Sequence, residues 1–551
     1  MFCNKYHVNL LTALLPRYGI THVVVCPGSR NAILVHNFAE HPDLQIHPVT
    51  DERSAAFVAL GIAVAVQKPV AVCVTSGSAL LNTLPAVAEA YFRNLPLLVV
   101  SADRPPQWIN QLDGQTLPQA GALRPYCHTF TLTEPSADST PESESAWWCR
   151  RTVCEALIAL RRNGGGPVHI NVPIAEPLFE FTTRRLPEAP AIDFWEPVPD
   201  NPLPAEIMTA IGRARLPLLV IGQYERPDDP AIAAIEKDGS LLVLPELIAN
   251  QPHSDRMAAI EENPALIETL RPDLIVHIGG NLVGKALKQQ IRQLPDCRII
   301  RIAPDDTFPD TFRHLSVLIK SPLTPALRQL AETLPAHHGV ARAKHLLKNA
   351  ISALTGETAD KARKTDAVRT ARHSGHAAIM RVFAGYIRSN APQLAAIHLA
   401  NSTTIRAAAF CFTGGGVPML CNRGVNGIEG SLSTAVGHAL ASTGLNIVFI
   451  GDLSFFYDQN ALWNEELPDN LRVVLLNDGG GRIFHTLPGL GASPARDRYI
   501  AAQHHATAQG IAAAYGLDYL SAQSAEEVKA LAGEVLCEKR GALILEVFLH
   551  D

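Results

Sequence analysis

The 551-residue sequence lacks a strong excess of charge of either sign. Its 47 Lys and Arg residues and 53 Asp and Glu residues give a formal net charge of −6 at pH 7. Nucleic acids and anionic membranes attract proteins through strongly basic surfaces, which this balance does not supply. The composition therefore argues against a protein that binds nucleic acid or a membrane surface.

Long apolar runs and an export signal are also missing. The apolar stretches are interrupted by Pro, Gly, Ser or charged residues before they reach the roughly 20 residues that span a bilayer. Residues 1–20 carry apolar residues at helical spacing but no signal-peptide cleavage pattern. We therefore expect a cytoplasmic protein with no membrane span.

Paired cysteines are the third absence. The ten cysteines are scattered, and none forms a CxxC pair, so neither a zinc site nor a disulfide framework is indicated. Cys26, Cys73 and Cys421 lie within strand-like apolar runs. Buried thiols in a reducing compartment explain this pattern best.

What the sequence does contain is a series of short aliphatic runs, each about one strand long, between longer helix-like segments. Examples are "PVAVCVTSGS" at 69–78, "LPLLVIGQ" at 216–223 and "NIVFIGDLS" at 446–454. Continuous apolar strands that alternate with helices indicate parallel sheets covered on both faces. The chain is also too long for a single core. The sequence therefore predicts several α/β domains.

Two segments divide these runs into three groups. Residues 182–205 are rich in proline, as an extended linker should be, and residues 336–374 are rich in Lys, Arg and His. The second segment is most simply a solvated helix and a connection. We therefore expect three doubly wound α/β domains at 1–181, 206–335 and 375–551, without a low-complexity tract.

Polar residues gather where the strands of the first and third groups end. In open parallel sheets, ligands bind beyond the carboxyl ends of the strands. The ends in the first group read "PGSR" (27–30), "DER" (51–53), "TSGS" (75–78) and "ADRPP" (102–106), and those in the third read "ANS" (400–402), "NRG" (422–424), "GDLS" (451–454) and "NDGGG" (477–481). The middle group offers fewer polar residues, so the two outer domains should carry the site.

Two of these strand ends together suggest a metal site. Asp452 ends one strand, and the second strand after it ends in Asn477 and Asp478, with 24 residues, 453 to 476, between Asp452 and Asn477. Hard oxygen ligands on neighbouring strand ends, beside a helix N-terminus, can hold Mg²⁺ against a diphosphate. Either element alone is more often a turn with a capping Asp, but the pair favours a metal site.

This spacing resembles the diphosphate-binding motif of thiamine diphosphate-dependent enzymes, although Leu453 replaces the glycine that is common there. Glu52 lies where that family has a glutamate that acts on the aminopyrimidine of the cofactor. The motifs "PGSR", "DER", "VTSG" and "ADRPP", with "NRGVNGIEGSLSTAVG", "IVFIGDLSFFYDQNAL" and "GGGRIFHTLP" in the third domain, resemble one branch closely. That branch is the family of 2-succinyl-5-enolpyruvyl-6-hydroxy-3-cyclohexene-1-carboxylate synthases of menaquinone biosynthesis.

The resemblance implies a transferase, a decarboxylating carboligase. It would decarboxylate 2-oxoglutarate and add the succinic semialdehyde carbanion to isochorismate, releasing CO₂. The implied cofactors are thiamine diphosphate and Mg²⁺, with Mn²⁺ as a possible substitute. The implied assembly is a homodimer or homotetramer with active sites between subunits. The alternative within the superfamily is another 2-keto acid decarboxylase or an acetolactate synthase.

The same resemblance assigns the catalytic and cofactor residues. Glu52 would hydrogen-bond the pyrimidine N1′, although Asp51 and Glu52 could instead simply complement a helix N-terminus. The metal ligands would be Asp452, Asp478 and the Gly480 carbonyl. The cofactor contacts would be Thr75, Ser76, Gly77, Ile428, Gly451, Asp452, Leu453, Ser454, Asp478, Ile483 and Phe484.

The substrate residues implied by the resemblance are mostly basic or polar. They are Arg30, Arg104, Gln115, Lys285, Ser402, Arg406, Arg423 and Leu487. Guanidinium groups gathered in one cleft need anions to balance them, and both implied substrates are dicarboxylates.

A different class of function is suggested by "GGNLVGK" at 279–285, whose spacing nearly matches a P-loop. Ala286 occupies the position of the Ser or Thr that would bind Mg²⁺, which disfavours a nucleotide hydrolase. A cofactor-free binding protein that keeps only the fold is the third alternative.

Overall fold

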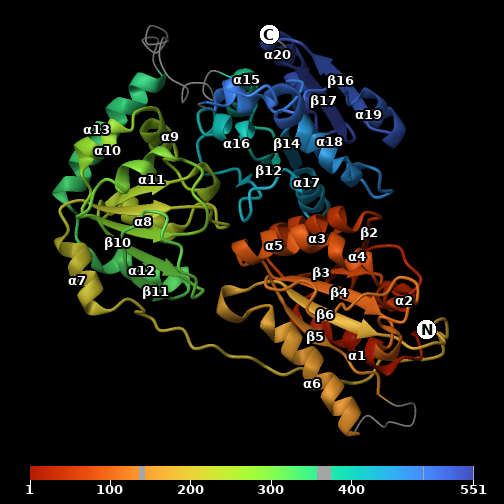
Figure 1. Cartoon of the computed structure of the whole chain (residues 1–551). Helices are drawn as coiled ribbons and strands as arrows, with labels where there is room; N and C mark the ends of the chain where they lie inside the picture. The colour runs from red at the N-terminus through yellow and green to blue at the C-terminus, as the bar shows by residue number, and fades with distance from the viewer. Residues whose placement is uncertain (136–142, 356–373, 488, 550–551) are drawn as a thin grey trace. The chain divides into compact units, whose positions relative to one another are not determined.

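The computed structural model describes residues 1–135, 143–355, 374–487 and 489–549, and in these it shows three sheets, each flanked by helices (Figure 1). The predicted class, three parallel α/β domains, is confirmed. By their contacts the residues form two compact units. The first holds Met1–Trp195, Gly424–Thr443 and Ser454–Leu471, and the second holds Glu196–Arg423, Gly444–Leu453 and Arg472–Asp551.

The first sheet has six strands in the order β2-β1-β3-β4-β6-β5, and its strand pairs are parallel. Its strands are β1 (His22–Val25), β2 (Gln45–Pro48), β3 (Val70–Val74), β4 (Leu97–Asp103), β5 (His128–Thr131) and β6 (Val168–Pro173). Its helices are α1 (Tyr6–Leu14), α2 (Ala32–Glu40), α3 (Glu52–Val66), α4 (Ser78–Asn82), α5 (Leu84–Arg93) and α6 (Glu144–Ala159). Figure 1 shows α1 and α6 on one face of this sheet and α3 to α5 on the other, which explains why every residue of β3 is buried.

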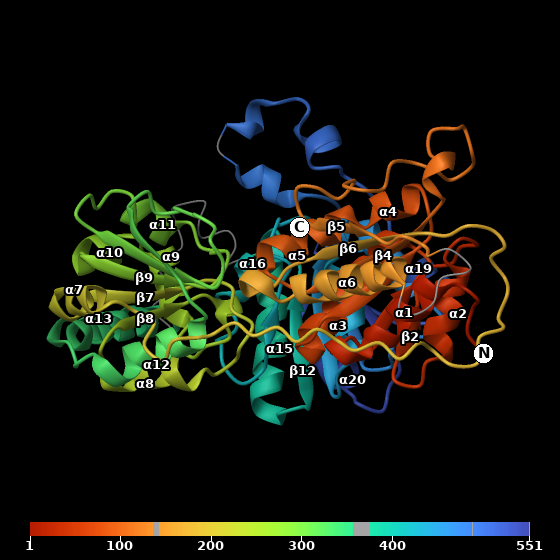
Figure 2. The ribbon, with the colours of Figure 1, turned by 90° about the horizontal axis from the view of Figure 1, so that it is seen from below.

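The central sheet has five strands in the order β11-β10-β9-β7-β8. Its strands are β7 (Pro217–Ile221), β8 (Leu242–Pro245), β9 (Leu274–Ile278), β10 (Arg298–Ala303) and β11 (Leu315–Lys320). Its helices are α7 (Ala205–Arg213), α8 (Pro230–Asp238), α9 (Asp255–Glu262), α10 (Ala265–Leu270), α11 (Ala286–Ile291), α12 (Leu323–Thr333) and α13 (His338–Thr355). Figure 2 shows this sheet between α9 to α11 and the pair α8 and α12. Leu218 and Val220 accordingly join one core and Leu219 and Ile221 the other, as alternation along a strand requires.

The third sheet has six strands in the order β13-β12-β14-β15-β17-β16, which repeats the permutation of the first sheet. Its strands are β12 (Leu394–Leu399), β13 (Met419–Leu420), β14 (Leu445–Gly451), β15 (Leu471–Asn477), β16 (Asp518–Ala522) and β17 (Leu543–Phe548). The helices of this part of the chain are α15 (Gly375–Asn390), α16 (Thr403–Ala408), α17 (Ser431–Leu440), α18 (Asp452–Asp458), α19 (Gln509–Tyr515) and α20 (Ala525–Val535). In both six-stranded sheets the strand order reverses between the first and third strands, where a ligand is expected.

Helices α3 and α17 cross at a very short distance because each presents a glycine to the other. A Cβ atom on Gly61 would lie 2.0 Å from the Thr434 carbonyl oxygen. A Cβ atom on Gly437 would likewise lie 2.0 Å from the Val58 carbonyl oxygen. Only residues without a side chain permit this approach, so the crossing depends on both glycines.

The two connecting segments differ from each other. Residues 184–204 form no helix or strand, and Thr183 bridges to Phe2. The basic segment was predicted to be a solvated helix and connection, and its helix α13 instead packs Val340, Ala343 and Leu347 into the central core. The rest of that connection, 356–373, lies outside the described residues, and the exact domain boundaries stay predictions.

Two further observations concern membrane spans and cysteines. No helix among the residues described is long and apolar enough to cross a membrane. All ten cysteines are free thiols, and eight of them are buried.

Candidate functional site

Glu52 and its neighbour Asp51 have separate roles at the start of α3. The Asp51 Oδ1 atom accepts the backbone N–H groups of Arg53 (2.9 Å) and Ser54 (3.1 Å), so Asp51 is the helix cap. The Glu52 carboxylate instead accepts the side-chain amide of Asn82 at 3.0 Å. The alternative interpretation, in which both acids only complement the N-terminus of the helix, therefore accounts for Asp51. The Glu52 carboxylate faces Asn82 and makes no capping hydrogen bond.

The loop Thr75–Gly77 follows β3, beside the end of β1. Thr75 and Ser76 are buried, and within the described chain the Thr75 hydroxyl has no hydrogen-bond partner. A Cβ atom on Gly28 would lie 2.4 Å from the Thr75 Cβ, so the glycine of "PGSR" lets the two loops meet. A buried hydroxyl without a protein partner fits a polar ligand at this predicted cofactor contact.

Arg104 and Gln115 are brought together with the cofactor loop. The Arg104 Nε donates to the Gly114 carbonyl at 3.2 Å, and its guanidinium pairs with Asp113 at 2.8 Å. The position of a Cβ on Gly77 is 3.1 Å from the Gln115 carbonyl carbon. Three predicted site residues, from the segments that follow β3 and β4, therefore share one region of the first domain.

Arg30 is buried and already engaged by the protein. Its guanidinium donates to the Ile174 carbonyl at 3.1 Å and pairs with Glu176 at 3.1 Å. The Glu176 side chain is 67% exposed, so its charge is largely screened by water. An anionic substrate would therefore compete with Glu176 for this guanidinium.

The predicted metal ligands Asp452 and Asp478 lie at the ends of β14 and β15, which are neighbours in the third sheet. Asp452 is buried and accepts the N–H groups of Leu453 (2.6 Å) and Gly480 (2.9 Å). Burial, and after it the charge of Asp478, raises the pKa of Asp452. Two carboxylates that repel each other in a buried place fit a divalent cation between them.

The side chains here form an incomplete cage. Across the part of the chain that the structure describes, no three His, Cys, Asp or Glu residues gather as a metal site. Two carboxylates and a backbone carbonyl would leave positions that diphosphate oxygens and water can fill, as Mg²⁺ prefers. The residues present therefore fit Mg²⁺ bound together with a diphosphate.

Two histidines border this pair of carboxylates, and sequence reasoning missed both. His504 Nε2 lies 3.2 Å from Asp452 Oδ2, and His376 Nε2 lies 3.5 Å from Asp478 Oδ2. They come from segments far from either aspartate in sequence, so no local pattern could have identified them.

A buried acid holds the loop that carries Asp478. Glu546, on β17, accepts the Asn477 side-chain amide at 2.7 Å, the Ala508 N–H at 2.9 Å and the Tyr519 hydroxyl at 2.7 Å. Asn477 in turn accepts the Gly479 N–H at 3.1 Å. A single acid inside the apolar run "ALILEVFL" was the signal in the sequence that could have revealed it.

The predicted apolar cofactor contacts are at least partly accessible. Ile428 is 40% exposed, and its carbonyl accepts the hydroxyl of the buried Ser454. Ile483 and Phe484 are half-buried, and Leu487 is 42% exposed. These side chains can therefore line a pocket, and their contact with the cofactor stays a prediction.

Arg406 and Arg423 lie close to each other in the second unit. Arg423 donates to the side-chain oxygens of Asn401 (3.0 Å) and Asn281 (3.1 Å), which are neutral acceptors. Burial, followed by the positive charge of Arg423, lowers the pKa of Arg406. Each guanidinium disfavours the positive charge of the other, and an anionic ligand between them would offset this repulsion.

Lys285 lies in the P-loop-like segment, whose N–H groups do not form a free phosphate cradle. Gly284 N–H donates to Glu246 at 3.0 Å, and the N–H groups of Lys285 and Ala286 each donate to Glu261 at 2.9 Å. These carboxylates occupy the donors that a phosphate would need. The Lys285 side chain is exposed, and its predicted substrate contact stays a prediction.

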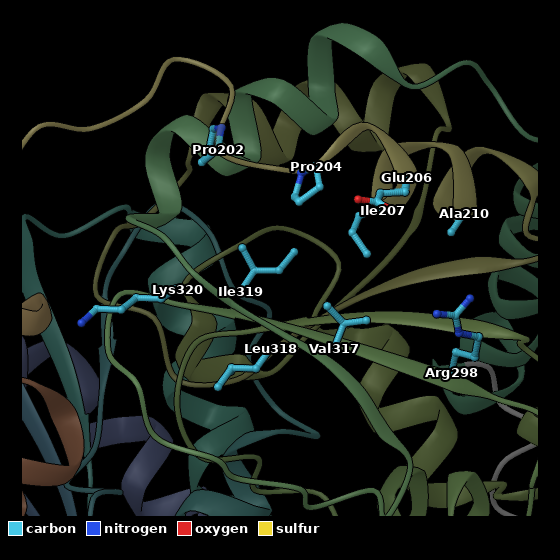
Figure 3. Close-up of a pocket in the computed structure, with 10 residues that line it drawn as sticks. All are labelled: Pro202, Pro204, Glu206, Ile207, Ala210, Arg298, Val317, Leu318, Ile319 and Lys320. Atoms are coloured by element: carbon cyan, nitrogen blue, oxygen red, sulfur yellow. The ribbon is translucent and has the colours of Figure 1, made fainter.

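A pocket of about 540 Å³ lies elsewhere, on the central domain (Figure 3). Figure 3 shows Ile207 of α7 facing Val317 and Ile319 of β11 across it. None of the predicted site residues lines this pocket. This pocket is therefore separate from the predicted site residues.

The comparison with protein families matches residues 7–122 to the thiamine pyrophosphate enzyme N-terminal TPP binding domain. A protein from Bacteroides fragilis is 39% identical over 545 residues, which cover 96% of this chain and 93% of that protein. One from Desulfotalea psychrophila is 34% identical over 559 residues, covering 99% and 98%. Both are named 2-succinyl-5-enolpyruvyl-6-hydroxy-3-cyclohexene-1-carboxylate synthase.

Among solved structures, an X-ray structure from Mycobacterium smegmatis assigned as a thiamin diphosphate-dependent enzyme covers 99% of both chains with a TM-score of 0.72. Its sequence identity is 19%, so it supports the fold alone.

Proposed function

This chain belongs to the 2-succinyl-5-enolpyruvyl-6-hydroxy-3-cyclohexene-1-carboxylate synthase family of thiamine diphosphate-dependent enzymes, and from this membership we propose that it is a decarboxylating carboligase. Its substrates would be 2-oxoglutarate and isochorismate. The C1–C2 bond of 2-oxoglutarate breaks and CO₂ leaves. The electron pair kept at C2 forms the new carbon–carbon bond to the ring alkene, and the ring takes up one proton.

The observation that carries the proposal is the pair of carboxylates, Asp452 and Asp478, on neighbouring strand ends. Mg²⁺ would relieve their mutual repulsion, and the two carboxylates and the Gly480 carbonyl would hold it together with a diphosphate. Thiamine diphosphate, when bound, supplies the electron sink that decarboxylation of a 2-keto acid requires. The residues of this chain would hold, orient and desolvate it.

Glu52 is the proposed catalytic residue. Asp51 accepts the capping hydrogen bonds of α3, and the Glu52 carboxylate accepts none of them. It would hold a proton at N1′ of the cofactor aminopyrimidine, a role that suits a carboxyl group in a mostly apolar site.

The basic residues would select dicarboxylates. Arg30 and Arg104 in the first unit, and Arg406 and Arg423 in the second, each place a guanidinium near a strand end. Bidentate guanidinium–carboxylate contacts fix orientation as well as charge. Pyruvate, with a single carboxylate, would leave part of this charge unbalanced.

The assembly and location are part of the same proposal. We expect a homodimer or homotetramer in which Glu52 of one subunit completes a site whose metal is held by Asp452 of another. The cytoplasm fits the ten free thiols, which a reducing compartment preserves.

The deciding experiment reconstitutes the metal-free, cofactor-free protein with thiamine diphosphate and Mg²⁺ and measures CO₂ release and product formation. We expect turnover of 2-oxoglutarate with isochorismate, and little turnover of pyruvate. A preference for pyruvate would assign the chain to another thiamine diphosphate-dependent decarboxylase or to an acetolactate synthase. If the protein is inactive with and without Mg²⁺, and calorimetry detects no binding of thiamine diphosphate, the chain would instead be a cofactor-free binding protein that keeps only the fold.

A further inference from the structure

Gln119 is a buried amide in a loop of the first domain, where the other residues of 111–120 are exposed or half-buried. It is 1% exposed, whereas both of its neighbours, Pro118 and Ala120, are exposed. Its Oε1 accepts the Gly77 N–H at 2.7 Å. Its Nε2 donates to Asn171 Oδ1 at 2.8 Å and to the Ala102 carbonyl at 3.1 Å, and lies 3.1 Å from the Ser101 hydroxyl. Both ends of this amide are therefore fully used.

Asn171 extends the hydrogen bonds to the end of β4. Its Nδ2 donates to Asp103 Oδ2 at 2.8 Å, and Asp103 Oδ1 accepts the Arg104 N–H at 2.8 Å. Burial raises the pKa of Asp103, while the Asn171 and Arg104 hydrogen bonds and the charge of Arg30 lower it. The far end of this chain of bonds therefore adjoins both proposed anion-binding arginines of the first domain.

The direction of the bonds is fixed by the two ends of the chain. The Gly77 N–H can only donate, and the Asp103 carboxylate can only accept. Gln119 must therefore turn its oxygen to Gly77 and its nitrogen to Asn171, and Asn171 must turn its nitrogen to Asp103. Neither amide can rotate by half a turn without breaking the bond at one end.

His169 lies next to this chain of hydrogen bonds and stays uncharged near neutral pH. His169 Nε2 lies 2.7 Å from the Ser101 hydroxyl, which also donates to Asn171 at 3.0 Å. Burial lowers the pKa of His169 to about 3, so the ring stays neutral. The chain of bonds thus keeps one arrangement over the working pH range.

The segments joined by Gln119 are those that the proposed function uses. Gly77 has φ +84°, a left-handed conformation, and is closely packed against the backbone of Gln115. Its N–H is held by Gln119, and its carbonyl accepts the Leu80 N–H at 3.2 Å at the start of α4. The Arg104 side chain reaches the same loop through Gly114.

We propose that Gln119 is a positioning residue that fixes the cofactor loop Thr75–Gly77 and the substrate-binding end Asp103–Arg104 in one mutual geometry. The proposal rests on the proposed function of these two segments. Because Gln119 bonds Gly77 directly and reaches Asp103 through Asn171, loss of its bonds changes cofactor and substrate binding together.

The first test is hydrogen exchange of the full-length protein, with Gln119→Met as the variant. Methionine keeps the length of the side chain but makes neither bond. The matched control is Gln251→Met in the central domain, because Gln251 is also 1% exposed, accepts the Asp229 N–H and donates to the Arg226 and Ala249 carbonyls. We expect faster exchange in both 75–78 and 103–116 for Gln119→Met, and in neither segment for Gln251→Met.

The second test is kinetic and uses the holoenzyme with thiamine diphosphate and Mg²⁺. For Gln119→Met we expect the KM for 2-oxoglutarate and the Kd for the cofactor each to rise about tenfold or more, with kcat changed less. Gln119→Glu, which keeps an acceptor for Gly77 but cannot donate to Asn171, serves if the methionine variant does not fold. It should raise the KM while leaving exchange at 75–78 slow.

The outcomes separate this proposal from the proposed function. If the unaltered protein turns over pyruvate rather than 2-oxoglutarate, the proposed function fails while the exchange result still decides the role of Gln119. For Gln119→Met, faster exchange confined to 116–122, or a change in the KM for 2-oxoglutarate without a change in the Kd for the cofactor, would overturn the positioning role.

Discussion

Ser402 has a backbone conformation that serine rarely adopts. Its φ of 73° and ψ of −127° place it at the N-cap of α16, directly after β12. Gly77 has nearly the same angles, φ 84° and ψ −138°, at the equivalent place in the first domain. Glycine takes this conformation without steric cost, whereas a residue with a Cβ is strained by about 1–3 kcal/mol. Strain retained at a strand end supports a functional role for the serine hydroxyl.

The strain makes Ser402→Gly a test of that role. We expect Ser402→Gly to raise the free energy of unfolding by about 1 kcal/mol, because released strain exceeds the extra entropy of glycine in the unfolded chain. Ser402→Ala keeps the strain and serves as the control. Both variants should raise the KM for substrate, whereas only the glycine variant should raise Tm. Equal stability of the two variants would contradict the strain.

Glu246 is a buried carboxyl group with an unusual affinity for its proton. Burial, with the charge of Glu261, raises its pKa from 4.5 to about 7, although the Gly284 N–H and the charges of Lys288 and Arg423 oppose the shift. The folded protein therefore binds a proton here more tightly than the unfolded chain does. The resulting stability is fully present below pH 4.5 and is lost as the pH rises to about 7.

Glu246→Gln removes this titration and provides its measurement. We expect the wild type to lose up to about 3 kcal/mol of stability relative to Glu246→Gln between pH 4.5 and 7.5. Urea unfolding at several pH values measures the difference, in which the titration of all other groups cancels. Parallel pH profiles of the two proteins would show that Glu246 has an ordinary pKa.

At the scale of elements, the crossing of α3 and α17 has the tightest geometric requirement. Gly61 and Gly437 each lie against a backbone carbonyl of the other helix. Helix α3 begins with Glu52, and α17 follows the loop of Ile428 within the same compact unit. The distance between these helices therefore influences the separation of two predicted cofactor contacts.

Gly437→Ala tests the requirement directly. The added methyl group would force the helices apart, and we expect a loss of about 2–3 kcal/mol in the free energy of unfolding. The matched control is Gly385→Ala in α15, where a Cβ meets nothing within 4 Å. That control should be neutral or gain up to about 1 kcal/mol from helix propensity. Similar losses in both variants would argue against close packing at Gly437.

For the whole molecule, the decisive question is whether the active site combines two subunits. Glu52→Gln and Asp452→Asn should each be inactive as homo-oligomers. When the two are co-expressed, half of the dimers are mixed and carry one intact site, so about a quarter of the wild-type activity should return. Each variant expressed alone is the control. If co-expression restores no activity, Glu52 and Asp452 of the same chain form one site.

The sequence predicted those parts of the molecule that depend on local pattern. Continuous apolar runs identified strands such as β3 and β14, and polar residues directly after them identified Thr75 and Asp452. Gln119 and His504 were missed because their partners are distant in sequence and their flanking residues do not reveal their burial. Glu546 was missed although it stands alone in an apolar run. The packing of α13 was missed because its charged residues obscured an apolar stripe of only three buried positions.

The first and third sheets share one strand permutation, and Gly77 and Ser402 share one backbone conformation. The two domains thus repeat one strand-end geometry, which carries glycine at 77 in the first domain and serine at 402 in the third. Each sheet therefore presents the same strand-end backbone geometry with different side chains on it. The side chains at the strand ends of one sheet can therefore change during evolution without altering those of the other sheet.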